Sequence, residues 1–245
     1  MYRFYVDKNM ISDEDITIEG SDVNHIKNVL RMRAGDRLIV NDTCGTDYYC
    51  VIDNISQDEI SLKVENIRQC EAELPSRLYL FQALPKLDKM ELIIQKAVEL
   101  GAYEVVPVIT KRCVVKLDGD KRQEKKLARW RSIAESAAKQ SARGIIPNVA
   151  DPMTFAEALE YSGKLEYNII PYEHAEGMDE ARRIMEEAAG KGSVGIFIGP
   201  EGGFEDEEIE KAIASGLKPI SLGNRILRTE TAGMTVLSIL MFRIG

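Results

Sequence analysis

The feature that most constrains this chain is a strand, loop and helix unit near its C-terminal end. Residues 194–198 form a short apolar run, and a turn rich in Gly and Pro follows at 199–204. The acidic, periodic stretch 205–215 then predicts a helix. Such a unit presents a backbone loop at the carboxyl end of a buried strand, which is where open α/β sheets bind ligands.

A second unit of the same kind follows directly. Residues 218–222 predict a short strand, Gly223 ends it, and a helix is expected over about 232–242 with Thr229 or Thr231 as its N-cap. One Gly-rich loop alone is common in α/β proteins. Two such loops, the second running through an exposed Arg-Thr-Glu-Thr stretch at a helix start, indicate a functional site.

The chain between residues 73 and 245 alternates strand and helix patterns. Strands are also expected at 78–84, 105–109 and 167–170, and helices at 87–100, 121–142, 154–161 and 178–189. Gly101 is placed to end the first of these helices. This alternation predicts an α/β fold with a parallel sheet covered by helices on both faces.

The first 72 residues have a different character. Short β-rich runs at 37–40, 48–52 and 60–64 are separated by polar turns, which predicts a small β-barrel. Residues 70–76 contain Pro75 and are expected to form a linker. We therefore predict two domains, at 1–72 and 73–245.

Composition excludes several classes of protein. The chain has 245 residues, no long apolar run and no signal-peptide pattern at its start, so a cytoplasmic protein is expected. The four cysteines show no CxxC spacing, so neither zinc nor another metal is expected. The loop at 199–203 is not GxGxxG, and no stretch of the chain matches GxxxxGK[ST], which argues against a nucleotide-dependent oxidoreductase or a P-loop enzyme.

Charge is unevenly distributed along the chain. The net charge is -8, yet residues 77–143 carry 15 Lys and Arg against 8 Asp and Glu. A predicted helix bears much of this basic excess, which has two readings: a solvated helix face, or a surface that contacts RNA phosphates.

Two strings carry a resemblance to a known family. Ile198–Phe204 reads IGPEGGF and Leu222–Ala232 reads LGNRILRTETA. They resemble the signature of the ribosomal small-subunit RNA uridine N3-methyltransferases, a branch of the trefoil-knot (SPOUT) S-adenosylmethionine methyltransferases. Matching pieces also occur, in order, at 25–31, 82–86, 90–101 and 129–143. A mild departure is Gly233-Met234, where the family is expected to carry small alanine-like residues.

The resemblance implies a fold and an activity. The fold would be a knotted SPOUT domain preceded by a PUA-like β-barrel that binds RNA. The activity would be transfer of a methyl group from S-adenosylmethionine to N3 of a uridine in 16S rRNA, by a homodimer. The apolar content of residues 234–242 exceeds what one buried helix face needs, which is consistent with a dimer. The alternative is a non-catalytic RNA-binding protein that retains the SPOUT fold.

The resemblance also assigns residues to a cofactor pocket and a catalytic step. Arg228 is the first candidate for stabilising the anion that develops on uracil, although it could instead tie the loop to Glu230 or Glu201. Glu230 is a weaker candidate for the general base. The expected cofactor-binding residues lie in the two loops and are Ile198, Gly199, Pro200, Glu201, Gly202, Gly203, Leu222, Gly223, Ile226, Leu227, Arg228, Thr231 and Ala232.

Basic residues outside the two loops are expected to contact RNA phosphates. They are His25, Lys27, Arg31 and Arg33 in the N-terminal domain and Lys111, Arg112 and Lys125 in the basic stretch.

Overall fold

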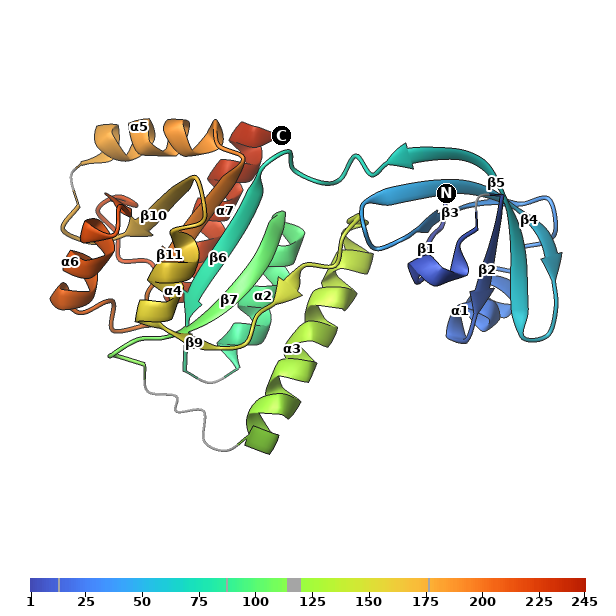
Figure 1. The fold of residues 1–245 in the computed structure, drawn as a ribbon, viewed down its shortest axis with the longest axis horizontal. Helices are drawn as coiled ribbons and strands as arrows, with labels where there is room; N and C mark the ends of the chain where they lie inside the picture. Colours follow the sequence, from blue (N-terminus) through green and yellow to red (C-terminus); the bar gives the residue numbers. More distant parts are fainter. Residues whose placement is uncertain (13, 87, 114–119, 176) are drawn as a thin grey trace. The chain divides into compact units, whose positions relative to one another are not determined.

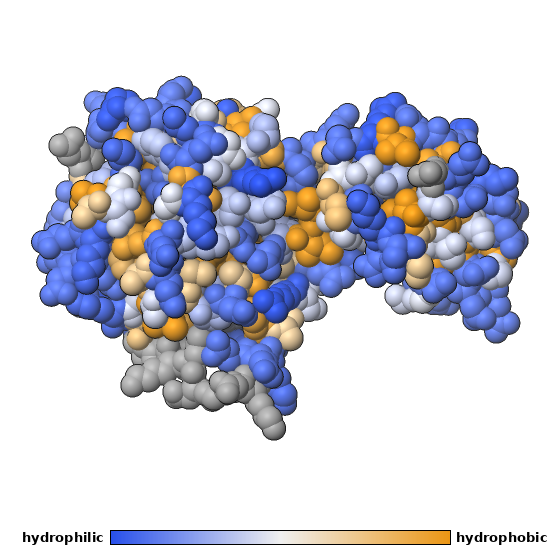
Figure 2. Space-filling view, in the orientation of Figure 1, coloured by the Kyte–Doolittle hydropathy of each residue, from blue (hydrophilic) through white to orange (hydrophobic). Residues whose placement is uncertain are grey.

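A computed structural model describes residues 1–12, 14–86, 88–113, 120–175 and 177–245, without the side chains of residues 120–122. The chain forms two compact units (Figure 1). The first contains Met1–Glu73 and Ala138–Ile146, and the second contains Leu74–Ala137 and Pro147–Gly245. Hydrophilic side chains cover most of the visible surface of both units (Figure 2).

The first unit is built on one five-stranded sheet. Its order is β1-β3-β4-β5-β2, with β1 parallel to β3 and the other pairs antiparallel. The strands are β1 (Arg3–Tyr5), β2 (Asp15–Glu19), β3 (Arg37–Asn41), β4 (Thr46–Ile55) and β5 (Glu59–Gln69). The three strands predicted from sequence are confirmed as β3, β4 and β5, while the short strands β1 and β2 were not predicted.

Alternating apolar residues of these strands face a shared core. Ile16, Ile18, Leu38 and Val40 are all at most 1% exposed. The segment after β2 begins as the helix α1 (Ser21–Asn24) and continues as a π-helix, η2 (His25–Val29). A short 3-10 helix, η1 (Lys8–Met10), lies between β1 and β2.

Residues 138–146 belong to the first unit through a buried ion pair. The Arg143 side chain is only 4% exposed and its Nη2 donates to Glu73 Oε2 at 2.6 Å. The backbone N–H groups of Gly144 and Ile145 donate to the other Glu73 oxygen, at 2.8 and 3.2 Å. Arg143 therefore has a structural role within the basic stretch.

The second unit contains a seven-stranded sheet in which every pair is parallel. The order is β12-β10-β11-β6-β7-β8, with β9 also paired to β7. The strands are β6 (Arg77–Ala83), β7 (Ala102–Ile109), β8 (Asn148–Val149), β9 (Met153–Thr154), β10 (Tyr167–Pro171), β11 (Ser193–Ile198) and β12 (Lys218–Ile220). The predicted parallel sheet is confirmed.

Six helices of the described chain belong largely to this unit. They are α2 (Lys89–Glu99), α3 (Asp120–Gln140), α4 (Phe155–Ser162), α5 (Met178–Ala189), α6 (Asp206–Ala214) and α7 (Thr229–Ile244). Helices α4 and α6 pack on the sheet face that carries Phe81 and Phe197. Helix α7 packs on the opposite face, beside Leu80 and Ile198, and contacts α2 and α5. Helices therefore cover both faces, as predicted.

Helix ends follow local chemistry, with one correction to the sequence analysis. Gly101, at φ +87°, follows the last residue of α2 and ends that helix as predicted. The predicted N-cap of α7 at Thr229 or Thr231 is wrong, because the N-cap is Arg228 and Thr229 is already helical. The Thr229 hydroxyl instead donates a hydrogen bond to the Gly199 carbonyl, outside the helix.

Among the helices of the described chain, none is both long and apolar enough to span a bilayer.

Candidate functional site

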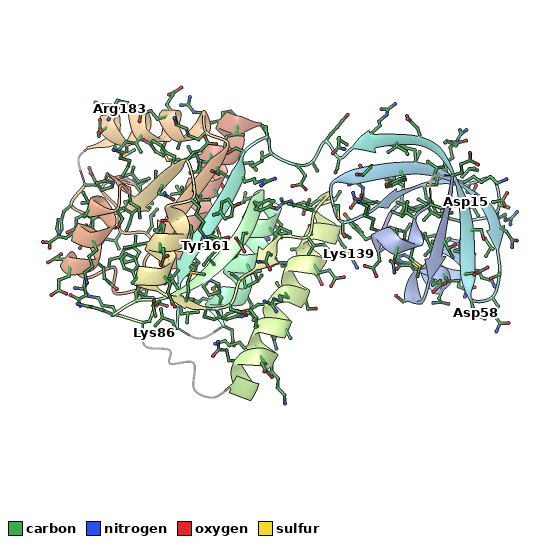
Figure 3. The ribbon with its side chains drawn as sticks, viewed as in Figure 1. Asp15, Asp58, Lys86, Lys139, Tyr161 and Arg183 are labelled. Carbon is green, nitrogen blue, oxygen red and sulfur yellow. The ribbon has the colours of Figure 1, made fainter. Side chains whose placement is uncertain are left out.

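The two signature strings form neighbouring loops at the carboxyl edge of the parallel sheet. Residues 199–204, here called the Gly199 loop, follow β11, and residues 221–228, here called the Gly223 loop, follow β12. Strand β10 separates β11 from β12 in the sheet, and β6 lies on the other side of β11. Lys86, labelled in Figure 3, follows β6 at the same edge.

A buried chain of hydrogen bonds joins β6, the Gly199 loop and the start of α7. Gln82, which is 0% exposed, donates from Nε2 to Thr229 Oγ1 at 2.9 Å. The Thr229 hydroxyl in turn donates to the Gly199 carbonyl at 2.6 Å. The other Gln82 side-chain atom, Oε1, is buried without a hydrogen-bond partner among the described residues. A buried amide oxygen of this kind costs free energy unless a donor reaches it.

Two glycines in the loops adopt backbone conformations that other residues rarely take. Gly203 has φ +71° and Gly223 has φ +97°, both in the left-handed region. A Cβ added to Gly199 would lie 3.2 Å from the Phe204 ring, closer than most real Cβ contacts. The conformations of Gly203 and Gly223, and the close packing of Gly199 against Phe204, therefore require glycine at these three positions.

Lys89 holds the two halves of the site together. Its Nζ lies 3.2 Å from Glu201 Oε1 in the Gly199 loop and 3.2 Å from Glu230 Oε2 in the first turn of α7. The backbone N–H of Lys86 also donates to Glu201, at 3.1 Å. Two carboxylates thus share one ammonium group, which leaves the cluster with a formal charge of -1.

The pKa values of this cluster shift in opposite directions. Desolvation lowers the pKa of Lys89, but its hydrogen bonds and attraction to Glu201 and Glu230 outweigh that effect and raise it overall. Desolvation raises the pKa of Glu201, but hydrogen bonds from backbone N–H groups and from Lys89 lower it overall. Lys89 and Glu201 are therefore both charged at neutral pH.

Sequence analysis did not identify Lys89 as a site residue. One signal was available, because Lys89 is the first residue of a helix, where the helix dipole favours an acidic side chain. A lysine in that position gains most when carboxylates from elsewhere in the fold surround it.

The predicted catalytic residues differ in exposure. Arg228 is exposed, and among the described residues it forms no ion pair or side-chain hydrogen bond. The Glu230 side chain is only 14% exposed. The alternative role for Arg228, a tie to Glu230 or Glu201, is absent from the described contacts, and Lys89 pairs with both carboxylates instead.

The predicted cofactor-binding residues range from buried to fully exposed. Ile198 and Pro200 are buried, whereas Ile226 is 94% exposed. Leu222, Leu227 and Ala232 are half-buried, as are Gly203 and Gly223, and Glu201, Gly202 and Thr231 are exposed at the residue level. Hydrogen bonds and ion pairs bring together the part of the set formed by Gly199, Glu201 and the start of α7.

Lys111 and Arg112 follow β7 at the same edge and contact the Gly199 loop and α6. Arg112 Nη1 donates to the Gly202 carbonyl at 2.6 Å, and its Nε donates to Glu205 at 2.8 Å. The Lys111 N–H donates to Glu208 at 2.9 Å, and its ammonium pairs with Glu207. Carboxylates therefore already offset both charges. Lys116, another cation of the basic stretch 77–143, lies outside the described residues.

The basic residues predicted to contact RNA in the first unit are exposed. They are His25, Lys27, Arg31 and Arg33. Arg31 has φ +55°, which is uncommon for a residue with a side chain, and it follows Leu30, the C-cap of the π-helical segment. Lys125 of α3 is also exposed.

No group of three or more His, Cys, Asp or Glu within the described ranges could hold a metal ion.

The lowered pKa of Glu201 gives a testable pH dependence. Because its pKa lies below the ordinary 4.5, the link to Lys89 and Lys86 stabilises the fold above that pH and is lost as pH falls through the folded pKa. We expect Glu201→Gln to lower the melting temperature at about pH 7. We expect the difference from wild type to shrink as pH falls below about 4. A difference that stays constant from about pH 7 to about pH 3 would contradict this role.

Two models of known protein families match different parts of the chain. Residues 72–241 match the family model described as an RNA methyltransferase domain, and residues 18–65 match an RNA methyltransferase PUA domain. The ribosomal RNA small subunit methyltransferase E of Bacillus subtilis is 37% identical over 249 residues, covering 99% of this chain and 97% of that protein.

Two solved structures are similar to this chain over nearly its whole length. A ribosomal RNA small subunit methyltransferase E from Neisseria gonorrhoeae bound to S-adenosyl methionine has a TM-score of 0.80 at 30% identity, covering 99% of this chain and 97% of that one. A Legionella pneumophila protein solved with bound SAM has a TM-score of 0.78 at 30% identity, covering 97% and 96%. The chain therefore belongs to the RNA methyltransferase family that includes the ribosomal RNA small subunit methyltransferases E, and it carries that family's PUA-type domain.

Proposed function

We propose that this protein transfers a methyl group from S-adenosylmethionine to N3 of a uridine in 16S rRNA. The observation that carries the proposal is the joining of the two signature loops through Gln82, Thr229 and Gly199, which leaves the exposed Arg228 directly beside them. The names of the relatives support an rRNA substrate of the small subunit. The choice of uridine N3 rests on the resemblance of the two signature strings.

The residues at the carboxyl edge fit S-adenosylmethionine. Gly203 and Gly223 allow a ligand to approach the loop backbone, and the unpartnered Gln82 Oε1 can accept a hydrogen bond from a ligand or water. The net negative charge of the Lys89, Glu201 and Glu230 cluster favours a cationic sulfonium over a phosphate. Two structural neighbours were solved with this cofactor. The residues proposed to hold the cofactor lie in the two signature strings. They are Ile198, Gly199, Pro200, Glu201, Gly202, Gly203, Leu222, Gly223, Ile226, Leu227, Arg228, Thr231 and Ala232.

Little chemistry is required of the protein, because S-adenosylmethionine supplies an activated methyl group. The protein must orient the uracil ring and favour loss of its N3 proton. We assign to Arg228 the stabilisation of negative charge on the uracil oxygens, since its guanidinium is exposed, can donate two parallel hydrogen bonds and has no carboxylate partner among the described residues. Glu230 is the second candidate, as a proton acceptor, although Lys89 competes for its carboxylate.

The same proposal extends to the fold. We infer that the second unit is a SPOUT domain with a trefoil knot, and that the PUA-like barrel ends near residue 72. Support comes from α7, which follows the outer strand β12 yet starts against Gly199 at the end of the central strand β11.

We propose that basic residues outside the two loops bind RNA phosphates. They are the exposed His25, Lys27, Arg31 and Arg33 of the first unit and Lys125 of α3. Lys111 and Arg112 would also bind phosphates, which would compete with the carboxylates of Glu207 and Glu205 for these two cations. We expect the enzyme to act in the cytoplasm without a metal.

A homodimer is expected from the exposed apolar residues of α7. Phe242 is 83% exposed and Ile239 is 39% exposed, and both lie in the second half of the helix. Burying them against a second copy would remove apolar surface from water. Light scattering at micromolar concentration should give twice the chain mass, and Phe242→Glu should shift it toward one chain. A wild-type monomer under these conditions would contradict the prediction.

Titration calorimetry and a transfer assay test the proposed activity. After chelator treatment, the protein should bind both S-adenosylmethionine and its demethylated product, and it should move a labelled methyl group to 16S rRNA. Failure to bind either ligand, or a requirement for added metal, would overturn the cofactor assignment. Binding without any transfer to rRNA would instead favour the non-catalytic RNA-binding alternative.

A further inference from the structure

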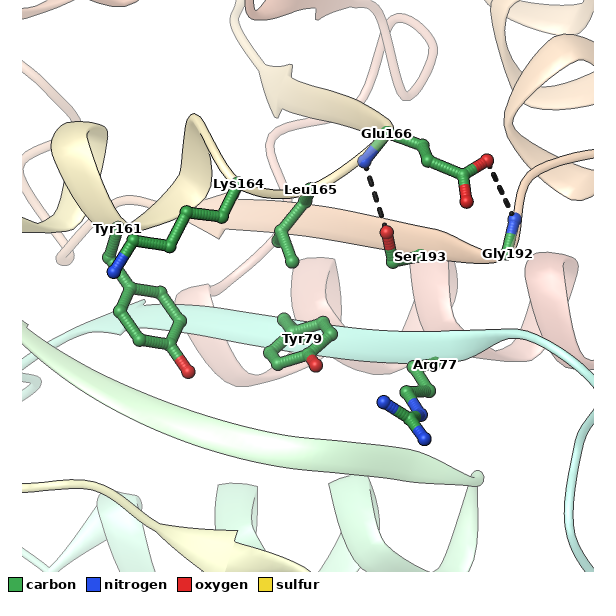
Figure 4. A pocket seen from close by; sticks show the side chains of 8 residues that line it. All are labelled: Arg77, Tyr79, Tyr161, Lys164, Leu165, Glu166, Gly192 and Ser193. Atoms are coloured by element: carbon green, nitrogen blue, oxygen red, sulfur yellow. Dashed lines mark hydrogen bonds between the residues drawn. The ribbon is translucent and has the colours of Figure 1, made fainter.

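A separate cavity of about 500 Å³ lies in the second unit, lined by residues at the opposite edge of the sheet (Figure 4). Arg77 is the first residue of β6 and Ser193 is the first residue of β11, so this is the amino-terminal edge. The Gly199 loop follows the carboxyl end of β11, and the Gly223 loop follows the carboxyl end of β12 in the same parallel sheet. The cavity is therefore distinct from the candidate active site.

Two cations and two tyrosines line this cavity. Figure 4 shows Lys164 beside Tyr161 at one end, Arg77 at the other, and Tyr79 between them. Lys164 Nζ lies 5.6 Å from the centre of the Tyr161 ring, and Arg77 Cζ lies 4.8 Å from the centre of the Tyr103 ring, which itself packs on Tyr79. Neither cation forms an ion pair with a carboxylate in the part of the chain that the structure describes.

The nearby acidic groups are engaged in structural contacts. Glu166 Oε2 accepts a hydrogen bond from the Gly192 N–H at 3.1 Å. Glu104, which is 7% exposed, accepts from Tyr161 Oη at 2.6 Å and from Asn148 at 2.5 Å. Burial and the bond to Glu104 raise the pKa of Tyr161, so its phenol stays protonated at neutral pH. The cavity lining therefore carries two cations without a carboxylate partner among the described residues and one carboxylate, Glu166, whose hydrogen bond comes from a backbone N–H group.

We propose that this cavity binds a ribonucleotide. Arg77 and Lys164 would contact the phosphate, and the faces and edges of Tyr79 and Tyr161 would contact the base. Paired cations alone would suit any small anion, but aromatic side chains between them are typical of sites that hold single nucleotides of a strand. A cavity of about 500 Å³ lies within the range of small-ligand sites.

The source of the nucleotide is either the RNA substrate or a free mononucleotide. An RNA source rests on the proposed function, and it would place a second contact with the strand on the sheet edge opposite the methylation site. Such a remote contact would add affinity and position the RNA without touching the reacting base. A free nucleotide would occupy the same groups.

Nuclear magnetic resonance titration of the full chain tests the site without using the methyl-transfer reaction. The probes are uridine 5′-monophosphate, uridine, inorganic phosphate and a short single-stranded oligoribonucleotide. We expect the monophosphate to shift the amide signals of Gly192 and Ser193, and to bind more tightly than uridine or phosphate alone. The double variant Arg77→Ala/Lys164→Ala should weaken this binding about tenfold or more, because two charge-assisted contacts are lost.

The matched control removes two exposed cations elsewhere in the same unit. Arg182→Ala/Lys211→Ala has the same net charge as the test variant and should keep wild-type affinity for the monophosphate. Tighter binding of the oligonucleotide than of the monophosphate would identify RNA as the source, and the reverse order would identify a free nucleotide. Equal loss in both double variants, phosphate binding as tightly as the monophosphate, or no shift at Gly192 and Ser193 would overturn the proposal. Cofactor titration of the same samples tests the proposed function separately.

Discussion

We expect Arg228→Ala to lower the rate of methyl transfer at saturating cofactor by about 10²-fold or more, the scale seen when one preorganised transition-state donor is lost. The reason is geometric and electrostatic. Arg228 is an exposed cation at the start of α7, and none of the described residues neutralises it. Cofactor affinity should change much less, because the proposed pocket walls are backbone and apolar groups. Single-turnover kinetics read beside calorimetric affinity measures both quantities.

Arg225 supplies the matched control for this experiment. It is also an exposed arginine of the Gly223 loop, so Arg225→Ala removes the same charge from the same segment. We expect it to retain most of the wild-type rate. If Arg228→Ala remained loaded, stably folded and as fast as wild type, Arg228 would be excluded from the chemistry and Glu230 would become the residue to test.

Lys89→Met should weaken cofactor binding about tenfold or more, which corresponds to about 1.4 kcal/mol. Without the ammonium group, Glu201 and Glu230 repel one another and the Gly199 loop loses its ion-pair link to α7. We expect this loss of loop geometry to outweigh the stronger attraction of the more negative cluster for the sulfonium. The melting temperature should fall as well. Calorimetry and thermal unfolding at neutral pH measure the two effects.

Two further variants separate the charge of Lys89 from its packing. Lys89→Arg keeps the positive charge and should restore most of the affinity. Lys86→Met should behave like wild type, because Lys86 contacts Glu201 through its backbone N–H and its side chain is exposed. If Lys89→Met bound the cofactor like wild type, or if Lys86→Met weakened it equally, the bridging role of Lys89 would be wrong.

Periodicity predicted the second unit well because its strands are buried on both faces and its helices are amphipathic. The run before Gly199 became β11, and the helices predicted at 154–161 and 178–189 became α4 and α5 with nearly the same bounds. Gly101 ended α2 as expected, since a positive φ suits glycine best. In the first unit, β1 has only three residues, too few for a period to be recognised.

Contacts between distant segments were beyond the reach of sequence patterns. Thr229 has the residue type of an N-cap, but the hydroxyl is better satisfied by Gly199 and Gln82, which lie 30 and 147 positions away along the chain. The same holds for Lys89, whose two carboxylate partners come from the Gly199 loop and from helix α7. The basic stretch looked uniform, yet Arg143 is buried against Glu73 while Lys125 is exposed. Only the fold distinguishes them.

Mass spectrometry of nucleosides from 16S rRNA tests the central claim most directly. RNA from cells that contain this protein is compared with RNA from cells that lack it, and with RNA from cells that carry Arg228→Ala instead. The account predicts 3-methyluridine in the first sample, its absence in the second and a strongly reduced amount in the third. Equal 3-methyluridine in all three samples, or loss of a different methylated nucleoside, would contradict it.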